Sequence, residues 1–411
     1  MRRGTLPVLV GALGSVAVAG VYRPLLSRWP LSVLNALPSA IASETPAVLA
    51  GAHVLAGAAA LRSRGFTRVA GLALNGAALA GLAGLAGDGR RSAEALAGAL
   101  REAEVPVGDA GHTGRPAGVL PGRVARRRYR RVADLTYSEH GPFGTLDVWH
   151  RADLPLDRRA PVLLQVHGGA WSTGDKVGQA EPLLGYLAER GWVCVTVNYR
   201  LAPAQRWPAM MVDVKRAIAW TREHISGHGG DPDFIAITGG SAGGHLAALA
   251  ALSPNDPDFQ PGFAEVDTTL AAAVPLYGVH DFTRDSQGLF ALLENKIIGT
   301  SFAEDGRTWR QASPALRVGP RTPPFFVVHG STDAIVGVEQ SRRFVAALRK
   351  SSPSVVGYAE LPHAQHGFDV LATARTAYTV DAAYRFLDSV WRRSVAAGAG
   401  ETGRSEAGVG R

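Results

Sequence analysis

The sequence predicts an α/β fold, with a mostly parallel central sheet flanked by helices, preceded by an N-terminal segment that is all-α. Two observations support this prediction. From residue 132 onward, short continuous apolar runs alternate with stretches of helical periodicity, as in strands buried on both faces of a parallel sheet. The first hundred residues instead contain long uncharged stretches rich in Ala and Gly. A length of 411 residues also favours one domain plus a further unit.

Residues 1–102 have the composition of membrane-spanning helices. Three uncharged stretches each approach the length of about 20 residues that crosses a bilayer, and their small residues would let helices pack closely in lipid. These stretches are Thr5 to Tyr22, Thr45 to Leu61 and Val69 to Gly87. We therefore expect two or three transmembrane helices and a location in a membrane, with the cell membrane as the first choice. Flanking arginines are evenly divided between the two ends, so the sequence does not predict the orientation.

Two alternatives to membrane helices remain open. Ala17-Val18-Ala19 resembles the cleavage site of a signal peptide, although a signal peptide would explain only the first stretch. Ala-rich helices of a soluble protein are the second alternative.

Basic residues are concentrated in the N-terminal third. Residues 1–131 contain 17 Arg and 6 acidic residues, a net +11, so with the whole chain at +8 the remainder sums to −3. These arginines flank apolar segments and lack interleaved aromatic residues, which favours membrane lipids over nucleic acid as the partner. Residues 103–131, rich in Gly, Pro and Arg, are expected to form a basic linker at the membrane surface, or else a mobile element over the functional site.

The second domain is expected to cover residues 132–395, with a disordered tail at 396–411. Its expected strands are the apolar runs at 161–166, 192–197, 234–237, 271–276, 325–328 and 355–361. Its expected helices are 178–190, 208–226, 242–252, 338–350 and 372–393. The single cysteine, Cys194, excludes a disulfide within the chain and is expected to be a buried small apolar residue.

A candidate nucleophile lies between an expected strand and an expected helix. Residues 239–244 read Gly-Gly-Ser-Ala-Gly-Gly, so that Ser241 is the serine of a G-x-S-x-G motif. In this context the motif forms a sharp turn, a nucleophile elbow, where larger flanking side chains would clash. Ser241 is therefore expected to stand at the tip of the turn.

A serine nucleophile needs a base, and the base needs an orienting carboxylate. Asp333 follows the expected strand at 325–328, at the sheet edge where catalytic groups collect, with a role in the turn as its alternative. His366 follows the last expected strand, and the neighbouring Gly367 would let it approach the serine closely. His363 is the local competitor for the role of base.

Backbone donors for an oxyanion are expected upstream. Gly168 and Gly169 end the strand at 161–166, and consecutive glycines free N–H groups to bind a developing negative charge. The N–H of Ala242, directly after the candidate nucleophile, would be the partner donor.

Together these motifs resemble the hormone-sensitive-lipase-like carboxylesterases and lipases of the α/β-hydrolase superfamily, over about residues 132–393. The segments Asn198 to Pro203 and Gly229 to Pro232, with Asp213 between them, add to the resemblance. The resemblance implies an α/β-hydrolase fold with an eight-stranded sheet. It also implies a triad and an oxyanion hole formed by Ser241, Asp333, His366, Gly168, Gly169 and Ala242. Two positions depart from the family pattern: Ala170 replaces the third glycine of His-Gly-Gly-Gly, and Gly240 replaces a residue that is often acidic.

The expected function is that of a serine carboxylesterase or lipase that hydrolyses a small-molecule or lipid ester through an acyl-enzyme, without a cofactor. The alternatives are an acyltransferase, an arylformamidase-like amide hydrolase and an inactive membrane scaffold. The chain has no H-E-x-x-H motif and no paired Cys/His spacing, so no metal is expected. Neither the acyl chain length, the natural alcohol nor the oligomeric state is predicted.

Other residues near the motifs receive weaker assignments. Trp171, Tyr199 and Phe290 are candidate substrate-binding residues, each with a structural role as the alternative, and the stretch from Tyr277 to Ser313 is long enough to carry a lid. Structural roles are expected for His245, His329, Asp175 and Lys176.

Overall fold

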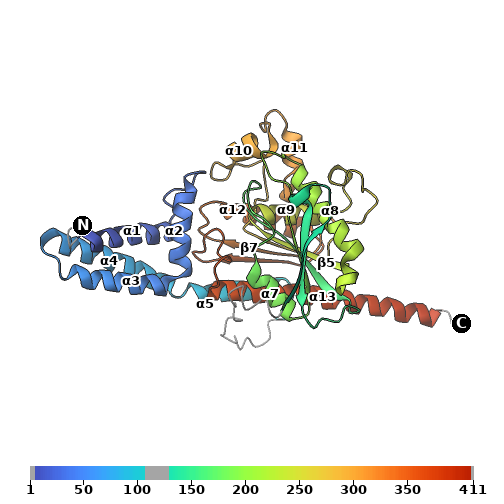
Figure 1. Cartoon of the computed structure of the whole chain (residues 1–411), viewed down its shortest axis with the longest axis horizontal. Coiled ribbons are helices and arrows are strands. Elements are labelled where there is room, and N and C mark those ends of the chain that lie inside the picture. The colour runs from blue at the N-terminus through green and yellow to red at the C-terminus, as the bar shows by residue number, and fades with distance from the viewer. Residues whose placement is uncertain (1–4, 107–128, 409–411) are drawn as a thin grey trace.

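The computed structural model describes residues 5–106 and 129–408, with side chains up to residue 397. Its helices and strands form two parts. A bundle of helices lies at one end, and a sheet covered by helices on both faces makes up the rest (Figure 1). We call α1 to α4 the N-terminal bundle, and the eight strands with α5 and α7 to α13 the sheet domain.

The sheet has eight strands in the order β1-β2-β4-β3-β5-β6-β7-β8. The six strands from β4 to β8 along this order run parallel, whereas β1 and β2 add an antiparallel pair at one edge. The strands are β1 Tyr129–Thr136, β2 Thr145–Arg151, β3 Ala160–Val166, β4 Val193–Val197, β5 Gly230–Gly240, β6 Ala272–Leu276, β7 Phe325–Gly330 and β8 Val356–Leu361. The mostly parallel, eight-stranded sheet is therefore confirmed.

The apolar runs predict the six parallel strands, and β1 and β2 are the strands they miss. Every residue of β3 is buried, as in a strand covered by helices on both faces. In β1, by contrast, most side chains are exposed, because it is the outermost strand and carries polar residues. An edge strand of this kind leaves no apolar run in the sequence.

Helices cover both faces of the sheet. On one face lie α8 Ala209–His224, α9 Ala242–Leu252 and α12 Glu339–Ser351, whose buried side chains share a core with Leu164 of β3. On the other face lie α5 Asp88–Glu102, α7 Glu181–Glu189 and α13 Ala374–Gly408, whose core includes Leu187 and Phe386. The helix expected at 372–393 thus continues to Gly408, through residues for which the sequence predicts a disordered tail.

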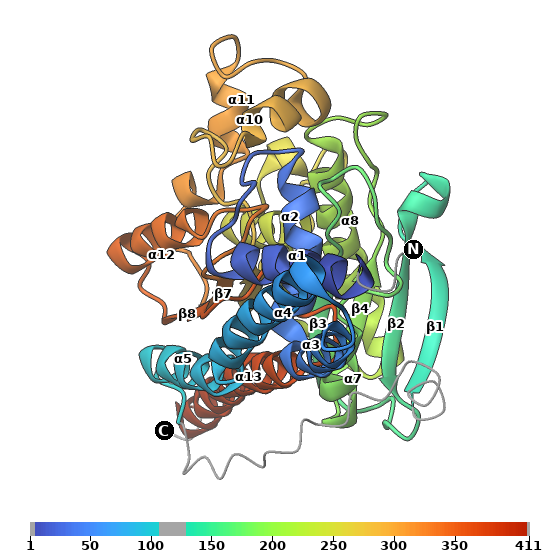
Figure 2. The same cartoon turned by 90° about the vertical axis from the view of Figure 1, so that its left-hand side faces the viewer.

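The helix α5 belongs to the sheet domain. The sequence groups residues 1–102 as one hydrophobic segment, but Leu96, Ala99 and Leu100 of α5 lie in the core beneath the sheet. Figure 2 shows α5 beside α13, at the β8 end of the sheet. Apart from Asp88, which is buried, the charged residues of α5 lie on its other face, which is the pattern of a helix on a soluble domain rather than in lipid.

The expected linker at 103–131 does not join the two parts. Its residues 107–128 lie outside the described part of the chain, and its last residues begin β1. In sequence this stretch connects α5 to β1, two elements of the same domain. The bundle is joined to the sheet domain instead by Ala86 and Gly87, between α4 and α5.

The N-terminal bundle consists of four helices. Three of them, α1 Thr5–Tyr22, α3 Pro46–Ala60 and α4 Gly65–Leu85, run side by side away from the sheet domain, and α2 Ser32–Glu44 crosses their end next to that domain (Figure 1). Two helices in the described chain are long and apolar enough to cross a membrane, Thr5–Tyr22 and Gly65–Glu102, while α3 is shorter. The second range includes α5. The helix α2, with Pro38 inside it, is not predicted by the sequence.

Small and polar residues lie in the interior of the bundle, beside an apolar cluster that includes Leu82 and Leu85. A Cβ atom added to Gly11 would lie 2.7 Å from Cβ of Leu74, so only glycine lets α1 and α4 approach this closely. The Asn75 side-chain amide donates to the carbonyl oxygens of Pro7, at 2.9 Å, and Gly71, at 2.7 Å. Its Oδ1 atom lies 2.8 Å from Nδ1 of His53. These contacts hold α1, α3 and α4 together.

Candidate active site

Ser241 occupies a sharp turn between β5 and α9. Its backbone has φ +58° and ψ −122°, a strained conformation for a residue other than glycine. The surrounding glycines are needed because a Cβ atom at Gly239 would lie 2.5 Å from the carbonyl of Gly243. The Ser241 N–H donates to the carbonyl of Leu276 at 3.0 Å, which ties the turn to β6. This geometry is that of the expected nucleophile elbow.

Asp333 and His366 are brought together at the ends of β7 and β8. Nδ1 of His366 lies 2.8 Å from Oδ2 of Asp333, and both side chains are largely buried. Since a carboxylate only accepts, Nδ1 must carry the proton, which leaves Nε2 of His366 free to accept one. The other carboxylate oxygen, Oδ1, accepts from the backbone N–H groups of Ile335 and Val336, each at 2.8 Å.

A second histidine supports Asp333. Nε2 of His329 lies 3.3 Å from Oδ2 of Asp333 and 2.8 Å from the carbonyl of Val336, so this nitrogen carries the proton. Its Nδ1 atom lies 2.7 Å from the Ser341 hydroxyl. Burial by itself would raise the pKa of Asp333, but the interactions with His366 and His329 outweigh burial and hold that pKa well below its usual range. Asp333 is therefore ionised, and the structural role expected for His329 is to hold this carboxylate.

His363 lies elsewhere. Its Nδ1 atom is 3.3 Å from Oδ2 of Asp88 in α5, and its ring contacts that of Tyr22 in α1, with 4.8 Å between centroids. The structure thus pairs His366 with Asp333, while His363 faces the N-terminal helices. The sequence could not separate the two histidines by distance, because both lie in one short loop.

The glycine loop after β3 lies against the elbow. A Cβ atom at Gly168 would lie 2.7 Å from the carbonyl oxygen of Gly240 and 3.4 Å from Cβ of Ser241, so this position must be glycine. The N–H of Gly168, however, donates to Oε1 of Gln179 at 2.8 Å. The Gly168 N–H is therefore already engaged in this structure, and its assignment to the oxyanion hole stays an expectation.

Three other N–H groups, two in the glycine loop and one at the elbow, make no hydrogen bond to any residue that the structure describes. They belong to Gly169, Ala170 and Ala242. Gly169 and Ala170 have positive φ angles, +126° and +50°, so the backbone turns away from a regular strand at these two residues. Ala170 occupies the third glycine position of the His-Gly-Gly-Gly motif, so the sequence could have identified it as a further candidate donor.

Two of the three candidate substrate-binding residues are core residues. Trp171 and Tyr199 are 1% and 0% exposed. Nε1 of Trp171 donates to Nδ1 of His245 at 3.1 Å, and the Tyr199 hydroxyl donates to the carbonyl of His167 at 3.0 Å. Both side chains are thus buried and hydrogen-bonded around the glycine loop, which favours the structural role that is their alternative.

The third candidate, Phe290, is partly buried in the stretch from Tyr277 to Ser313. This stretch contains α10 Leu289–Leu292, a π-helical turn at Leu293–Ile298 and α11 Gly306–Gln311. The ring of Phe290 packs edge-on against Trp309 of α11. The neighbouring Gln287 donates from its side-chain amide to the carbonyl of Asp333 at 3.2 Å, so the stretch contacts the site.

Tyr277 is a residue of the site that the sequence motifs do not identify. Its ring packs edge-on against that of His366, with 4.7 Å between centroids, and its hydroxyl donates to the buried carboxyl of Asp369. A Cβ atom at Gly240 would lie 2.6 Å from this hydroxyl. Tyr277 therefore explains why glycine occupies the position before Ser241. Burial raises the pKa of the Asp369 carboxyl.

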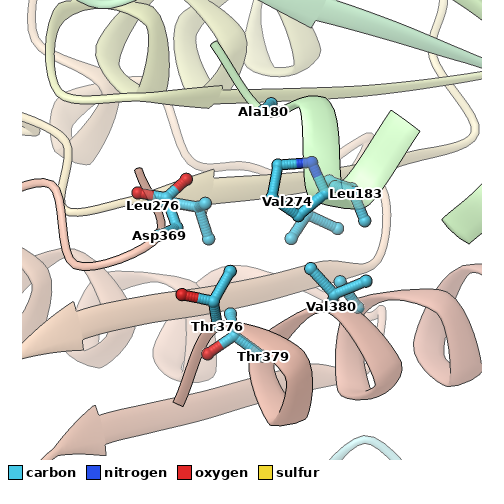
Figure 3. A pocket seen from close by; sticks show the side chains of 10 residues that line it. Ala180, Leu183, Val274, Leu276, Asp369, Thr376, Thr379 and Val380 are labelled. Carbon is cyan, nitrogen blue, oxygen red and sulfur yellow. The ribbon is translucent and has the colours of Figure 1, made fainter. Parts of the chain in front are cut away.

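A small cavity lies beneath the site, between α7 and α13. Figure 3 shows Asp369 and Thr376 beside the apolar side chains of Leu183 and Val380 around it. None of Ser241, Asp333 and His366 lines this cavity. It is therefore not the place where a substrate would meet the nucleophile.

Known proteins resemble both parts of the chain. The BD-FAE family matches residues 146–348. The "Probable carboxylic ester hydrolase LipM" of Mycobacterium tuberculosis is 44% identical over 403 residues, 93% of either chain, and this coverage must include most of the N-terminal bundle. The "Esterase LipQ" of the same organism is 46% identical over 301 residues, 71% of either chain.

Solved structures match the sheet domain. The esterase Est2 of Thermogutta terrifontis is 27% identical, with a TM-score of 0.53, covering 62% of this chain and 91% of that one. The same esterase has also been solved as the adduct phosphoramylated by tabun, with a TM-score of 0.53 and 27% identity, covering 63% of this chain and 94% of that one.

Proposed function

We infer the mechanism of this protein from its family: the chain belongs to the carboxylesterases of the α/β-hydrolase superfamily, as LipM and LipQ do, and is a serine hydrolase that acts on carboxylic ester bonds. We propose Ser241 as the nucleophile, His366 as the general base and Asp333 as the carboxylate that orients it. The contact of 2.8 Å between His366 and Asp333 carries this proposal, because it fixes the proton on Nδ1 and directs the basic Nε2 outward.

In the proposed reaction, His366 takes the hydroxyl proton of Ser241 as the oxygen attacks the ester carbonyl. The carbonyl oxygen becomes an oxyanion that accepts from the N–H groups of Gly169, Ala170 and Ala242. His366 then gives its proton to the leaving alcohol, and an acyl-enzyme remains on Ser241. Water repeats the two proton transfers and releases the acid. The ionised Asp333 stabilises the imidazolium that forms in each step.

The protein is further proposed to be membrane-attached, with a lipid ester as its substrate. The support comes from the bundle: α1 and α4 are long and apolar enough to cross a bilayer, and large apolar side chains on their surfaces are exposed. Two or three helices would span the membrane. The sheet domain would then work at its surface.

A fluorophosphonate probe tests the nucleophile. The full chain in detergent should be labelled, and Ser241→Ala should abolish labelling while Ser331→Ala, a serine near the site that is not at the elbow, should not. Undiminished labelling of Ser241→Ala would overturn the assignment. Hydrolysis of a p-nitrophenyl ester series then gives the preferred acyl length.

The same triad could pass its acyl group to an alcohol or cleave an amide. Adding alcohol acceptors to the ester assay distinguishes these functions from hydrolysis. We expect free acid as the main product, since both relatives named above are ester hydrolases or esterases. A transferred ester as the main product would favour the acyltransferase instead.

A further inference from the structure

The helix α2 has its polar and apolar faces reversed. The residues of its exposed face are Val33, Leu34, Leu37, Pro38 and Ile41, all of them apolar. The residues of its buried face are mostly polar: Ser32, Asn35, Ala36, Ser39, Ala42, Ser43 and Glu44. Leu34 and Leu37 are 67% and 66% exposed, whereas Ser39 is 1% exposed. A helix on a water-soluble surface shows the opposite pattern.

The buried polar face has specific partners. Ser39 donates to the carbonyl of Ala17 in α1 at 3.3 Å, and Ser43 donates to the carbonyl of His363 at 2.8 Å. Glu44 forms an ion pair with Arg375 of α13, and both side chains are buried. These contacts determine which face of α2 is buried. Its leucines are therefore exposed because specific hydrogen bonds and an ion pair hold the opposite face against the protein.

The exposed face of α2 continues the apolar surface of the bundle. Leu9, Leu13 and Val16 of α1 are exposed, as are Leu25, Leu26 and Leu31 in the segment that leads into α2. In Figure 1, α2 crosses the end of the bundle where α1 and α4 reach the sheet domain. Two exposed arginines, Arg23 and Arg28, lie in the same segment. An apolar face with arginines at its border suits an interface of lipid headgroups and acyl chains.

We propose that α2 is an interfacial helix: it lies in the plane of the bilayer surface, with Leu34, Leu37 and Ile41 in the lipid. This inference rests on the proposed membrane attachment. The lipid bilayer is the occupant that the structure favours, because the same apolar surface continues along helices that would span it. A second copy of the chain is the alternative occupant.

The placement of α2 also positions the catalytic loop. Through Ser43, α2 contacts the carbonyl of His363, three residues before His366. Through the backbone N–H of Trp29, the segment before α2 contacts the carbonyl of Gln287 at 2.7 Å, and Gln287 in turn contacts Asp333. With α2 at headgroup depth, the triad lies at the surface of the bilayer. The substrate class that fits is a membrane-resident lipid whose ester group lies at the interface.

A fluorescent label tests where α2 lies. Cys194 is fully buried, so a cysteine introduced at Leu37 can be labelled selectively with the environment-sensitive dye NBD. In vesicles of phosphatidylcholine and phosphatidylglycerol, doxyl-labelled lipids should quench the dye at position 37. The matched control is Leu156→Cys. Leu156 is an exposed leucine at the amino end of β3, whereas Ser241 follows the carboxyl end of the neighbouring strand β5. Equal quenching at both positions, or none at position 37, would overturn the proposal.

Kinetics provide the second test. Leu34→Asp should lower hydrolysis of a long-chain ester embedded in vesicles by roughly tenfold or more, because binding follows the apolar area in the lipid. Hydrolysis of a soluble short-chain ester should not change. A dimer of the full chain in detergent that Leu34→Asp dissociates would identify a second copy as the occupant and overturn the proposal. Failure of the parent protein to cleave any ester would overturn the proposed function alone, because the quenching result does not depend on activity.

Discussion

The two parts of this molecule differ in what they bury and in what they expose. In the sheet domain, β3 and α9 bury Val, Leu and Ala. In the bundle, glycine, Asn75 and His53 lie inside beside a small apolar cluster, and large apolar side chains such as Leu9 and Leu13 are exposed. Water drives apolar side chains inward, whereas lipid gives them no reason to leave the surface, so helices pack there through small residues and hydrogen bonds. The difference is the one expected if the bundle lies in lipid, as proposed above.

The largest expected effect is confined to the sheet domain. Asp333→Asn should lower kcat/KM for a soluble ester roughly 10⁴-fold, because an amide can hold His366 in the wrong tautomer. Partition of the protein into the membrane fraction should not change, since the bundle does not contact this side chain. A loss of less than tenfold in kcat/KM would contradict the triad, and release from the membrane would contradict the independence of the two parts.

The next largest effect is a loss of stability at the ion pair between Glu44 of α2 and Arg375 of α13, which connects the two parts. Glu44→Ala leaves Arg375 buried without its main partner and should lower the free energy of unfolding by about 3 kcal/mol. The matched control is Glu339→Ala, which removes a partly exposed pair with Arg342 and should cost less than about 1 kcal/mol. Thermal unfolding of the full chain in detergent measures both. Equal losses of stability in the two variants would mean that the Glu44–Arg375 pair contributes no more than a surface ion pair.

A smaller effect is expected inside the bundle. A side chain at Gly14 would collide with the ring of His53, so Gly14→Val should cost about 1 to 3 kcal/mol of stability through overpacking. Gly51 of α3 has open space around it, and Gly51→Val is the control. Both variants should keep full activity on a soluble ester if active enzyme is assayed below the unfolding temperature. Comparable destabilisation by both substitutions would show that the bundle does not pack through Gly14.

The smallest effect depends on pH. The folded pKa of Asp333 is depressed, so its contribution to stability is fully present above its unfolded pKa of about 4 and is lost as the pH falls further toward the folded value. The difference in unfolding free energy between the parent and Asp333→Asn should therefore shrink as the pH falls below about 4. A difference that keeps growing below that pH would contradict an ionised Asp333.

The sequence predicts the parallel strands well, and Ser241, Asp333 and His366 follow β5, β7 and β8 as the motifs lead one to expect, because each of these features depends on local order along the chain. An apolar run before a glycine turn defines the elbow without any knowledge of distant contacts. What the sequence could not provide depends on side-chain contacts that no motif records. The donation from Gly168 to Gln179 engages an expected oxyanion donor, and the contact of His329 with Asp333 adds a support that no motif contains.

The same limit explains the errors about α2 and α5. A helix on a water-soluble domain is recognised in a sequence by a polar face that is exposed. In α2 the polar face is buried and Pro38 lies inside the helix, so the sequence pattern does not predict it. In α5, the apolar residues Leu96, Ala99 and Leu100 are few, and only the presence of β8 and α13 shows what they cover. Both helices are defined by their partners rather than by their composition.

The position of α5 decides how this enzyme responds to a protease. A cut anywhere in 107–128 leaves α5 on the N-terminal fragment, yet Leu96 and Leu100 remain packed under the sheet with Phe386. The two fragments should therefore stay together as a nicked enzyme that keeps its N-terminal bundle. A truncated chain that starts after residue 107 would instead expose that apolar face to water, and a soluble version of the domain has to begin before Asp88.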